Sequence, residues 1–558
     1  MKVHEAIARV VVAEDCGPLF ALLGDANYML LAALGDRGPR VIHGRNEAAV
    51  IAMADGHARA TGRTALATIT CGPGLTQAGT SLVAAARNAS PLVVLTGDTP
   101  PHWPIKLQLL DQRRFVEACE ARYHRVAGHD TLAADLAEAY LAARLLRRPV
   151  VLSLDLDLLD RDLPDGWAYA PSAGLHAGPP VLRPDEGAVD DLARALASAR
   201  RPLLVAGRGA ALAGARDAIR GIGDRTGALL GTTLLARGLF EGDPFDAGVV
   251  GGYASSATRR LVGEADLVVG FGAELGNFTT MGMAPGVPTV RVDLAPLPWP
   301  SGLPPGRLVQ GDARETARML LERLPAGGAS DAGFRTEATR SALAAPVPLP
   351  ARPNDGADPR RLMLRMSDAL DGPTVVTVGV GHFASFPAIY LDLPPGSAMR
   401  FCLQFGSVGQ TLPVAAGAAL AEPLALHVCV EGDASLMMNL QEFETVARHA
   451  IPLTVLVFND GGLGAEVHKL TGKGLDPTVA RFAVTDFVAV ARSFGGDGAT
   501  VEHEDAIGDA IAAARRAPGL FVIDARVSPT TASDPYRRSH MGLPAESPLV
   551  QGRLVRRT

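Results

Sequence analysis

Cysteine is scarce in this chain, and no two cysteines are arranged as a pair. The five that occur stand at wide, irregular spacings without a CxxC motif. Such usage argues against a disulfide framework or a zinc site, and it is typical of reduced thiols in a cytoplasmic protein. The five are Cys16, Cys71, Cys119, Cys402 and Cys429.

Long apolar runs are also missing. No stretch approaches the ~18 consecutive apolar residues that a membrane span needs, so we expect no membrane partner. The first fifteen residues, "MKVHEAIARVVVAED", carry charges inside an amphipathic helical pattern. That pattern differs from a signal peptide and favours a cytoplasmic location.

Positive charge is not in excess. The net charge is −6 and the isoelectric point is near 6.1. These values argue against a nucleic-acid partner, which requires a basic surface. The hydrophobic fraction of 47% and charged fraction of 20% describe a globular protein. With 558 residues, the chain is too long for a single hydrophobic core.

Two segments rich in proline, glycine and aspartate divide the chain into three blocks. They span residues 160–188 and 344–360. In every block, short β-branched runs such as "PLVVLTG" and "IPLTVLVFND" alternate with Ala- and Leu-rich helical patterns. This alternation predicts an α/β protein with three doubly wound parallel sheets. We place the domains at 1–165, 183–343 and 355–530, followed by a tail at 531–558.

Two turns in the third block carry aspartate beside small residues. Asp433 lies in "CVEGDASLMMNL" and Asp460 in "VFNDGGLG", and each turn follows an apolar strand pattern. One interpretation is two surface turns, where Asp and Gly are favoured anyway. The other is a shared Mg²⁺ bound to a phosphate, because Mg²⁺ prefers carboxylate and phosphate oxygens. The carboxyl ends of parallel strands are where such ligands bind.

The third block resembles the thiamine diphosphate enzymes, in particular the acetolactate synthase and benzoylformate decarboxylase branch. The segment "QFGSVGQTLPVAAGAALAEP" (404–423), then "GDAS" and then "FND" stand in the order and spacing of that family. Its fingerprint is GDG followed by NN. Here Ala434 replaces the last glycine and Asp460 the second asparagine, which adds one negative charge.

The other two blocks carry the same resemblance. "HGRNEAAVIAMADGHARATGR" (43–63), the segment 70–98 and "LQLLD" (107–111) are similar to the family's pyrimidine-binding domain. The middle block, from "RPLLVAGRGA" to "EADLVVGFG", is similar to its central domain. The resemblance thus implies a pyrimidine-binding, a central and a diphosphate-binding domain.

The resemblance also implies a cofactor site. Asp433, Asp460 and the backbone carbonyl of Gly462 would hold Mg²⁺, and Ser435 with nearby N–H groups would hold the diphosphate. Val408 would wedge the cofactor into a bent shape. The implied cofactor contacts are Glu47, Gly72, Gly74, Gly406, Val408, Gly432, Asp433, Ala434, Ser435, Asp460 and Leu463.

Glu47 is the implied catalytic acid. It would hydrogen-bond the aminopyrimidine ring and so promote removal of the C2 proton, which makes the ylid that attacks a 2-oxo acid. Taken alone, it would be interpreted as an exposed glutamate in the first turn of a helix. In this family the pyrimidine-binding domain of one subunit faces the diphosphate-binding domain of another. We therefore expect a homo-oligomer, dimer or tetramer, with active sites between subunits.

Substrate contacts are less well marked. The predicted catalytic set adds Gln108 and His382 to Glu47, and Asn27, Tyr28 and His468 are further candidates. The sequence lacks the His-His pair of some decarboxylases and the Arg-Phe-Asp-Asp-Arg element of acetolactate synthases. "GRGA" at 207–210 is too weak a glycine pattern for a flavin, so we expect no FAD.

Three functions stay open at this point. The first is a decarboxylase or carboligase that acts on a 2-oxo acid. The second is a catalytically idle or regulatory relative, against which Glu47, Asp433 and Asp460 all argue. The third is a lyase for a CoA-linked or phosphorylated acid, because the segment 528–558 carries five arginines against two carboxylates. That tail is either disordered or a lid that excludes water.

Overall fold

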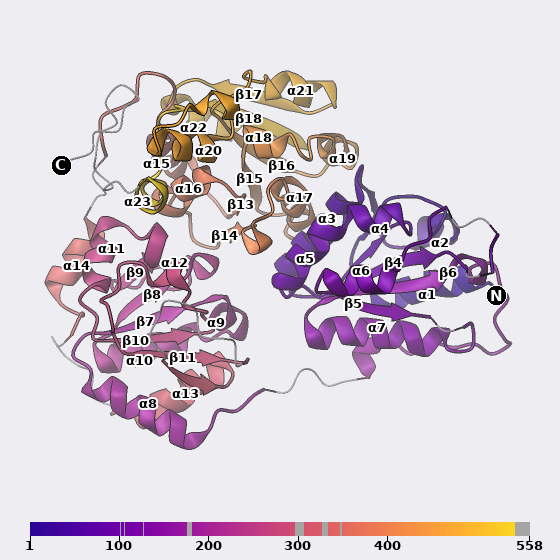
Figure 1. Cartoon of the computed structure of the whole chain (residues 1–558), viewed down its shortest axis with the longest axis horizontal. Coiled ribbons are helices and arrows are strands. Elements are labelled where there is room, and N and C mark those ends of the chain that lie inside the picture. The colour runs from indigo at the N-terminus through magenta and orange to yellow at the C-terminus, as the bar shows by residue number, and fades with distance from the viewer. Residues whose placement is uncertain are drawn as a thin grey trace.

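The computed structural model describes residues 1–100, 102–104, 107–126, 128–175, 181–295, 306–325, 333–345 and 349–541. It contains three six-stranded sheets, and every strand pair in them is parallel. Helices cover both faces of each sheet (Figure 1). The predicted fold of three doubly wound α/β units is confirmed. We call these units the first, central and third domains. Their boundaries as drawn from the sequence stay a prediction.

The first domain has the strand order β2-β1-β3-β4-β6-β5. Its strands are β1 (Leu19–Ala21), β2 (Val41–His43), β3 (Ala65–Thr68), β4 (Leu92–Asp98), β5 (Arg122–Arg125) and β6 (Pro149–Asp155). Its helices are α1 (Val3–Glu14), α2 (Tyr28–Leu34), α3 (Glu47–Thr61), α4 (Pro73–Gln77), α5 (Gly79–Arg87), α6 (Gln112–Ala118) and α7 (Leu132–Leu146).

The central domain has a different order, β12-β11-β10-β7-β8-β9. Its strands are β7 (Pro202–Ala206), β8 (Leu229–Thr232), β9 (Asp246–Val249), β10 (Leu267–Phe271), β11 (Thr289–Asp293) and β12 (Arg307–Gln310). Its helices are α8 (Glu186–Ser198), α9 (Arg208–Ala213), α10 (Arg216–Thr226), α11 (Ser256–Val262), α12 (Asn277–Thr280), α13 (Ala313–Arg323) and α14 (Glu337–Ala344). A Cβ on Gly207 would lie 2.1 Å from the carbonyl oxygen of Gly272, so this glycine of "GRGA" lets two loops pack.

The third domain has the order β14-β13-β15-β16-β18-β17. Its strands are β13 (Thr374–Val378), β14 (Ala398–Phe401), β15 (Leu426–Gly432), β16 (Leu453–Asn459), β17 (Asp497–Val501) and β18 (Leu520–Arg526). Its helices are α15 (Pro359–Ala369), α16 (Ser385–Tyr390), α17 (Thr411–Ala421), α18 (Asp433–Leu436), α19 (Glu442–Arg448), α20 (Gly464–Gly472), α21 (Phe487–Ser493), α22 (Ile507–Arg516) and α23 (Asp534–His540).

Helices α3 and α17 join the first and third domains of the same chain, and they lie side by side in Figure 1. A Cβ on Gly56 of α3 would lie 2.0 Å from the carbonyl oxygen of Val414. A Cβ on Gly417 of α17 would lie 1.9 Å from the carbonyl oxygen of Met53. Each helix therefore presents a glycine to the backbone of the other. Residues 411–419 of α17 are buried throughout, as expected of a helix that is apolar on all sides.

The third sheet reverses its strand order between β13 and β15. The chain passes from β13 to β14 on one side and then crosses to β15 and β16 on the other. In doubly wound sheets, ligands bind beyond the carboxyl ends of strands at such a point. In the described part of the chain, none of the helices is both long and apolar enough to cross a bilayer.

Candidate active site

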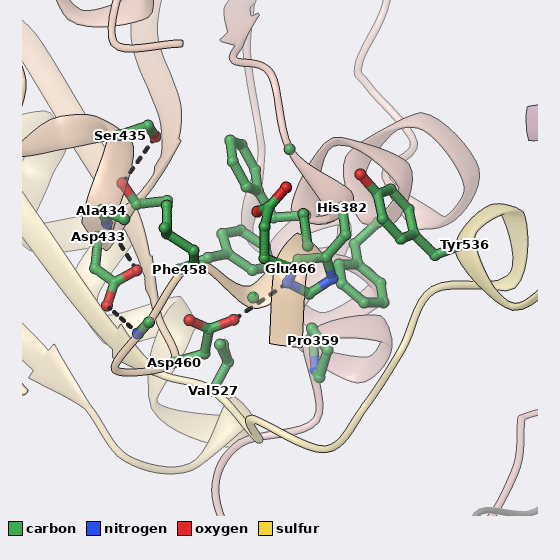
Figure 2. Close-up of a pocket in the computed structure, with 18 of the residues that line it drawn as sticks. Pro359, His382, Asp433, Ala434, Ser435, Phe458, Asp460, Glu466, Val527 and Tyr536 are labelled. Carbon is green, nitrogen blue, oxygen red and sulfur yellow. Dashed lines mark hydrogen bonds and ion pairs between the residues drawn. The ribbon is translucent and has the colours of Figure 1, made fainter. Parts of the chain in front are cut away.

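The carboxyl ends of three neighbouring strands form one wall of a cavity. His382 follows β13, Asp433 follows β15 and Asp460 follows β16. The cavity has a volume of about 210 Å³, and Figure 2 shows both aspartates on its wall. Many residues predicted from the sequence line it, namely His382, Val408, Gly432, Asp433, Ala434, Ser435, Asp460, Gly462 and Leu463.

Asp433 is held by backbone hydrogen bonds from two turns. The N–H of Ala434 donates to one carboxylate oxygen at 2.8 Å, and those of Gly461 and Gly462 donate to the other at 3.0 and 3.2 Å. Burial, and then the negative charge of Asp460, raise the pKa of Asp433 to about 7. Two carboxylates buried side by side repel each other, so the site favours a cation between them.

The donor set fits a hard divalent cation bound together with a phosphate. Among the described residues, no group of three or more His, Cys, Asp and Glu side chains is arranged to hold a metal on its own. Two carboxylates are what Mg²⁺ uses when phosphate oxygens complete its shell. The predicted contribution of the Gly462 carbonyl stays a prediction, because the group of Gly462 that contacts Asp433 in the structure is its N–H.

Ser435 is engaged with the chain itself. Its hydroxyl donates to the carboxylate of Glu431 and lies 3.0 Å from the carbonyl oxygen of Gly432. Glu431 is fully buried on β15, and burial raises its pKa to about 7. A hydroxyl has one hydrogen, so Ser435 would have to turn from Glu431 to donate to a diphosphate. The backbone N–H groups of the turn after β15 could face a diphosphate without giving up a bond to Glu431.

The loop before α17 contributes an apolar side chain to the cavity. Val408 lines it and is 37% exposed, which leaves its side chain free to meet a ligand. Gly406 has a φ of +65° and lies exposed in the same loop, outside the cavity lining in the described structure. Their predicted roles toward the cofactor stay predictions.

A second cluster of predicted residues lies in the first domain. Glu47 begins α3, where the Asn46 side chain caps the helix by accepting from the N–H of Ala48. A Cβ on Gly74 would lie 3.0 Å from the Glu47 Oε1 atom. Gly74 therefore leaves the space that this carboxylate occupies.

Gln108 belongs to the same cluster. Gly72 has a φ of +58°, and a Cβ there would lie 2.4 Å from the carbonyl oxygen of Gln108. The Gln108 Oε1 atom accepts from the thiol of Cys71 at 3.2 Å. The structure thus brings Glu47, Gly72, Gly74 and Gln108 together. Within the described residues, none of the four lines the cavity of the third domain.

Asn27 has a structural role rather than the predicted substrate contact. Its side chain is buried and donates to the carbonyl of Leu22 at 2.9 Å and the hydroxyl of Thr68 at 3.2 Å. Its oxygen accepts from the N–H of Gly24. All of these bonds fix the "GDAN" loop after β1. Tyr28 is 46% exposed next to it.

The cavity is also lined by residues that were not predicted from the sequence. Glu466 and Lys469 project from α20, with the Lys469 ammonium 3.2 Å from the Glu466 carboxylate and 5.8 Å from the centre of the Tyr536 ring. Phe386 and Phe458 add aromatic surface. Glu466 and Lys469 stand three residues apart, a spacing that places both on one face of a helix but does not indicate what that face contacts.

Tyr536 belongs to α23, the described part of the predicted tail. The guanidinium of Arg538 in the same helix donates to the carbonyl oxygen of Gly252 in the central domain at 2.7 Å. Residues 531–541 are therefore docked against the cavity and the central domain. The rest of the predicted lid, residues 542–558, lies outside the described residues.

Three models of one protein family match this chain. The N-terminal TPP-binding domain of thiamine pyrophosphate enzymes matches residues 1–112, the central domain 189–320 and the C-terminal TPP-binding domain 379–525. These matches cover the turns that hold Glu47, Asp433 and Asp460.

Curated relatives and solved structures agree with that match. The chain is 27% identical to a probable 2-ketoarginine decarboxylase of Pseudomonas aeruginosa over 88% of each chain. It is 29% identical to an acetolactate synthase large subunit of Parasynechococcus marenigrum, over 91% of this chain and 85% of that one. A thiamine diphosphate-dependent 4-hydroxybenzoylformate decarboxylase of Rhodococcus jostii shares the fold, with a TM-score of 0.77, 21% identity and coverage of 95% and 99%. Sequence, fold and strand-end residues lead to one conclusion: the chain belongs to the thiamine pyrophosphate enzyme family.

Proposed function

We propose that this chain is a thiamine diphosphate- and Mg²⁺-dependent enzyme that decarboxylates a 2-oxo acid, with or without transfer of the remaining acyl unit to an acceptor. The observation that carries the proposal is the pair of buried carboxylates, Asp433 and Asp460, at the ends of adjacent strands. An idle relative would have no need to keep two repelling carboxylates and Glu47.

The residues divide into binding and catalytic roles. Asp433 and Asp460 would hold Mg²⁺, and the N–H groups of the two turns would face the diphosphate. When bound, thiamine diphosphate supplies the carbon nucleophile and the electron sink for the reaction. Glu47 would hold a proton against the ring nitrogen of the cofactor, and Val408 would set its bend.

Lys469 supports an anionic substrate. It is the one lysine or arginine among the residues that line the cavity in the described part of the chain. Its side chain is 37% exposed, so a substrate carboxylate could reach it past Glu466. The aromatic rings of Phe386, Phe458 and Tyr536 would exclude water from the reacting carbon.

The direct test is a panel of 2-oxo acids given to the purified protein with thiamine diphosphate and Mg²⁺. We expect CO₂ release and an aldehyde or a C–C coupled product, both measured by mass spectrometry, from at least one acid. The Glu47→Gln variant supplies the background. Bound cofactor without turnover of any 2-oxo acid, including CoA-linked and phosphorylated ones, would favour the idle relative.

We also propose that each site is shared between two copies of the chain. The support is that, among the described residues, the Glu47 cluster does not line the cavity of its own chain. Mixing two inactive variants, Glu47→Gln and Asp433→Ala, tests this. Random pairing would restore about a quarter of the sites, because half of the dimers are mixed and each holds one intact site. Sites built within a single chain would regain nothing.

A further inference from the structure

Asp460 differs from the amide that the family pattern has at this position. An asparagine offers a cation one oxygen and fills the other branch with an NH₂ donor. An aspartate places a second oxygen on that branch, which needs a donor of its own when buried. The side chain of Asp460 is only 7% exposed.

His382 supplies that donor. Its Nε2 atom lies 3.2 Å from the Asp460 Oδ2 atom, and its side chain is 8% exposed (Figure 2). A carboxylate only accepts, so the Nε2 atom must carry the hydrogen and donate it. The contact joins the ends of β13 and β16, which flank β15 and Asp433.

The backbone of α20 is built around this pair. A Cβ on Gly464, the first residue of α20, would lie 2.1 Å from the Asp460 Oδ2 atom and 2.5 Å from the His382 Nε2 atom. Glycine is thus the residue that leaves room for the hydrogen bond. The ring of His468 packs edge-on against His382, with ring centroids 4.7 Å apart, and fixes its plane.

We propose that His382 is a positioning residue: it holds one oxygen of Asp460 in a hydrogen bond and leaves the other oxygen for the divalent cation. In this way the Asp460–His382 pair would do what an asparagine does in the family pattern. The inference rests on the proposed role of Asp460 as a metal ligand. It assigns His382 to the metal site rather than to proton transfer with the substrate.

The expected consequence is metal selectivity. Mg²⁺ demands near-octahedral geometry and takes one oxygen from a carboxylate, whereas Ca²⁺ accepts both oxygens. With His382 removed, Asp460 could offer both. We expect His382→Phe to shift the ratio of Mg²⁺- to Ca²⁺-supported cofactor binding toward Ca²⁺ by roughly tenfold, the size of one lost hydrogen bond to a charged group.

The experiment is calorimetry of thiamine diphosphate binding at fixed Mg²⁺ or Ca²⁺, which needs no turnover. His468→Phe is the matched control, since it changes the same ring cluster without removing the donor to Asp460, and we expect its ratio to stay at the wild-type value. His382→Gln keeps an N–H donor and is expected to retain most of the selectivity. In His382→Phe/Asp460→Asn, the ratio should equal that of Asp460→Asn alone, because an amide has one oxygen.

Gly464→Ala provides a second way to break the pair if His382→Phe does not fold. We expect the same shift toward Ca²⁺, because the new methyl group displaces both atoms. An unchanged ratio in whichever of these variants folds would overturn the role of His382. Wild-type cofactor binding that persists unchanged in EDTA would instead overturn the proposed metal site, so the two failures are distinguishable.

Discussion

The first and third domains have the same strand order but carry different residues after their third strands. Counted within each domain, both sheets run 2-1-3-4-6-5. After its third strand, the third domain has Asp433, and after its fourth, Asp460. The first domain has "ITCGPG" after β3, with two glycines where backbone and side chains pass closely. The fold alone therefore does not decide what a domain binds; the residues at the strand ends do.

The difference suggests that these two domains, although they share one sheet topology, contribute differently to the site. The third domain places two carboxylates where they would hold a cation, and that cation would in turn bind the diphosphate. The first domain places Glu47 and Gln108 beside the glycine-rich turn that follows β3. Substitutions in the first and third domains should therefore impair different steps. A substitution that weakens the contact between the two domains should instead lower the stability of the fold.

The largest effect is expected from Glu47→Gln. The fold and cofactor binding should persist, while exchange of the cofactor C2 proton for deuterium slows by about 10²- to 10⁴-fold, because an amide cannot share the proton. Nuclear magnetic resonance after acid quench measures the exchange rate. Exchange at the wild-type rate would remove Glu47 from the mechanism and the first domain from catalysis.

Asp433→Ala should impair cofactor binding itself. Cofactor affinity in Mg²⁺ should fall by roughly 10²- to 10³-fold, because the cation loses a buried ligand and the N–H groups of Gly461 and Gly462 lose their acceptor. Calorimetry measures this loss, with Cys71→Ser in the corresponding turn of the first domain as the comparison. Equal losses of cofactor affinity in both variants would contradict the different contributions of the two domains.

Gly417→Ala should weaken the contact between the domains. The new methyl group meets the Met53 carbonyl, and such overpacking destabilises by about 1–3 kcal/mol. Gly508→Ala in α22 is the matched control, since its Cβ would have its nearest neighbour at 4.0 Å and alanine favours a helix. Chemical denaturation should show a lower free energy of unfolding for Gly417→Ala and no decrease for Gly508→Ala. Equal stabilities would show that α3 and α17 can move apart to accommodate the methyl group without losing stability.

The smallest effect concerns pH. Glu442 of α19 is buried at this contact and accepts from the N–H of Arg45 at 3.1 Å. Burial raises its pKa from 4.5 to about 7, so the folded state binds its proton more tightly than the unfolded state. The resulting stability is complete below pH 4.5 and is lost as the pH rises through 7. Relative to Glu442→Gln, the wild type should lose on the order of 1 kcal/mol across that window in thermal denaturation. Parallel pH profiles would show that Glu442 does not titrate there.

Much of the fold could be predicted because parallel strands have a strong local signature. The burial of every position in β4 up to Gly97, and of all of β16, appears in the sequence as nearly continuous apolar runs. Asp433 and Asp460 were also predictable, since their turns follow such strands. Asn27 was misjudged because a polar residue in a loop looks the same whether it binds a ligand or the loop itself. Glu466 and Lys469 lie on α20 and Tyr536 on α23, and only tertiary packing reveals that these two helices meet at the cavity.

Gly464 has a consequence for how this site could have evolved. Asp460, His382 and Gly464 form a unit in which the order of substitution matters. An asparagine at 460 tolerates many neighbours, but an aspartate there, without a donor at 382, would leave a buried oxygen unpaired. We therefore expect the donor and the small residue to have been present before the carboxylate. In lineages related to this chain, an acidic residue at 460 should always occur together with a hydrogen-bond donor at 382 and glycine at 464.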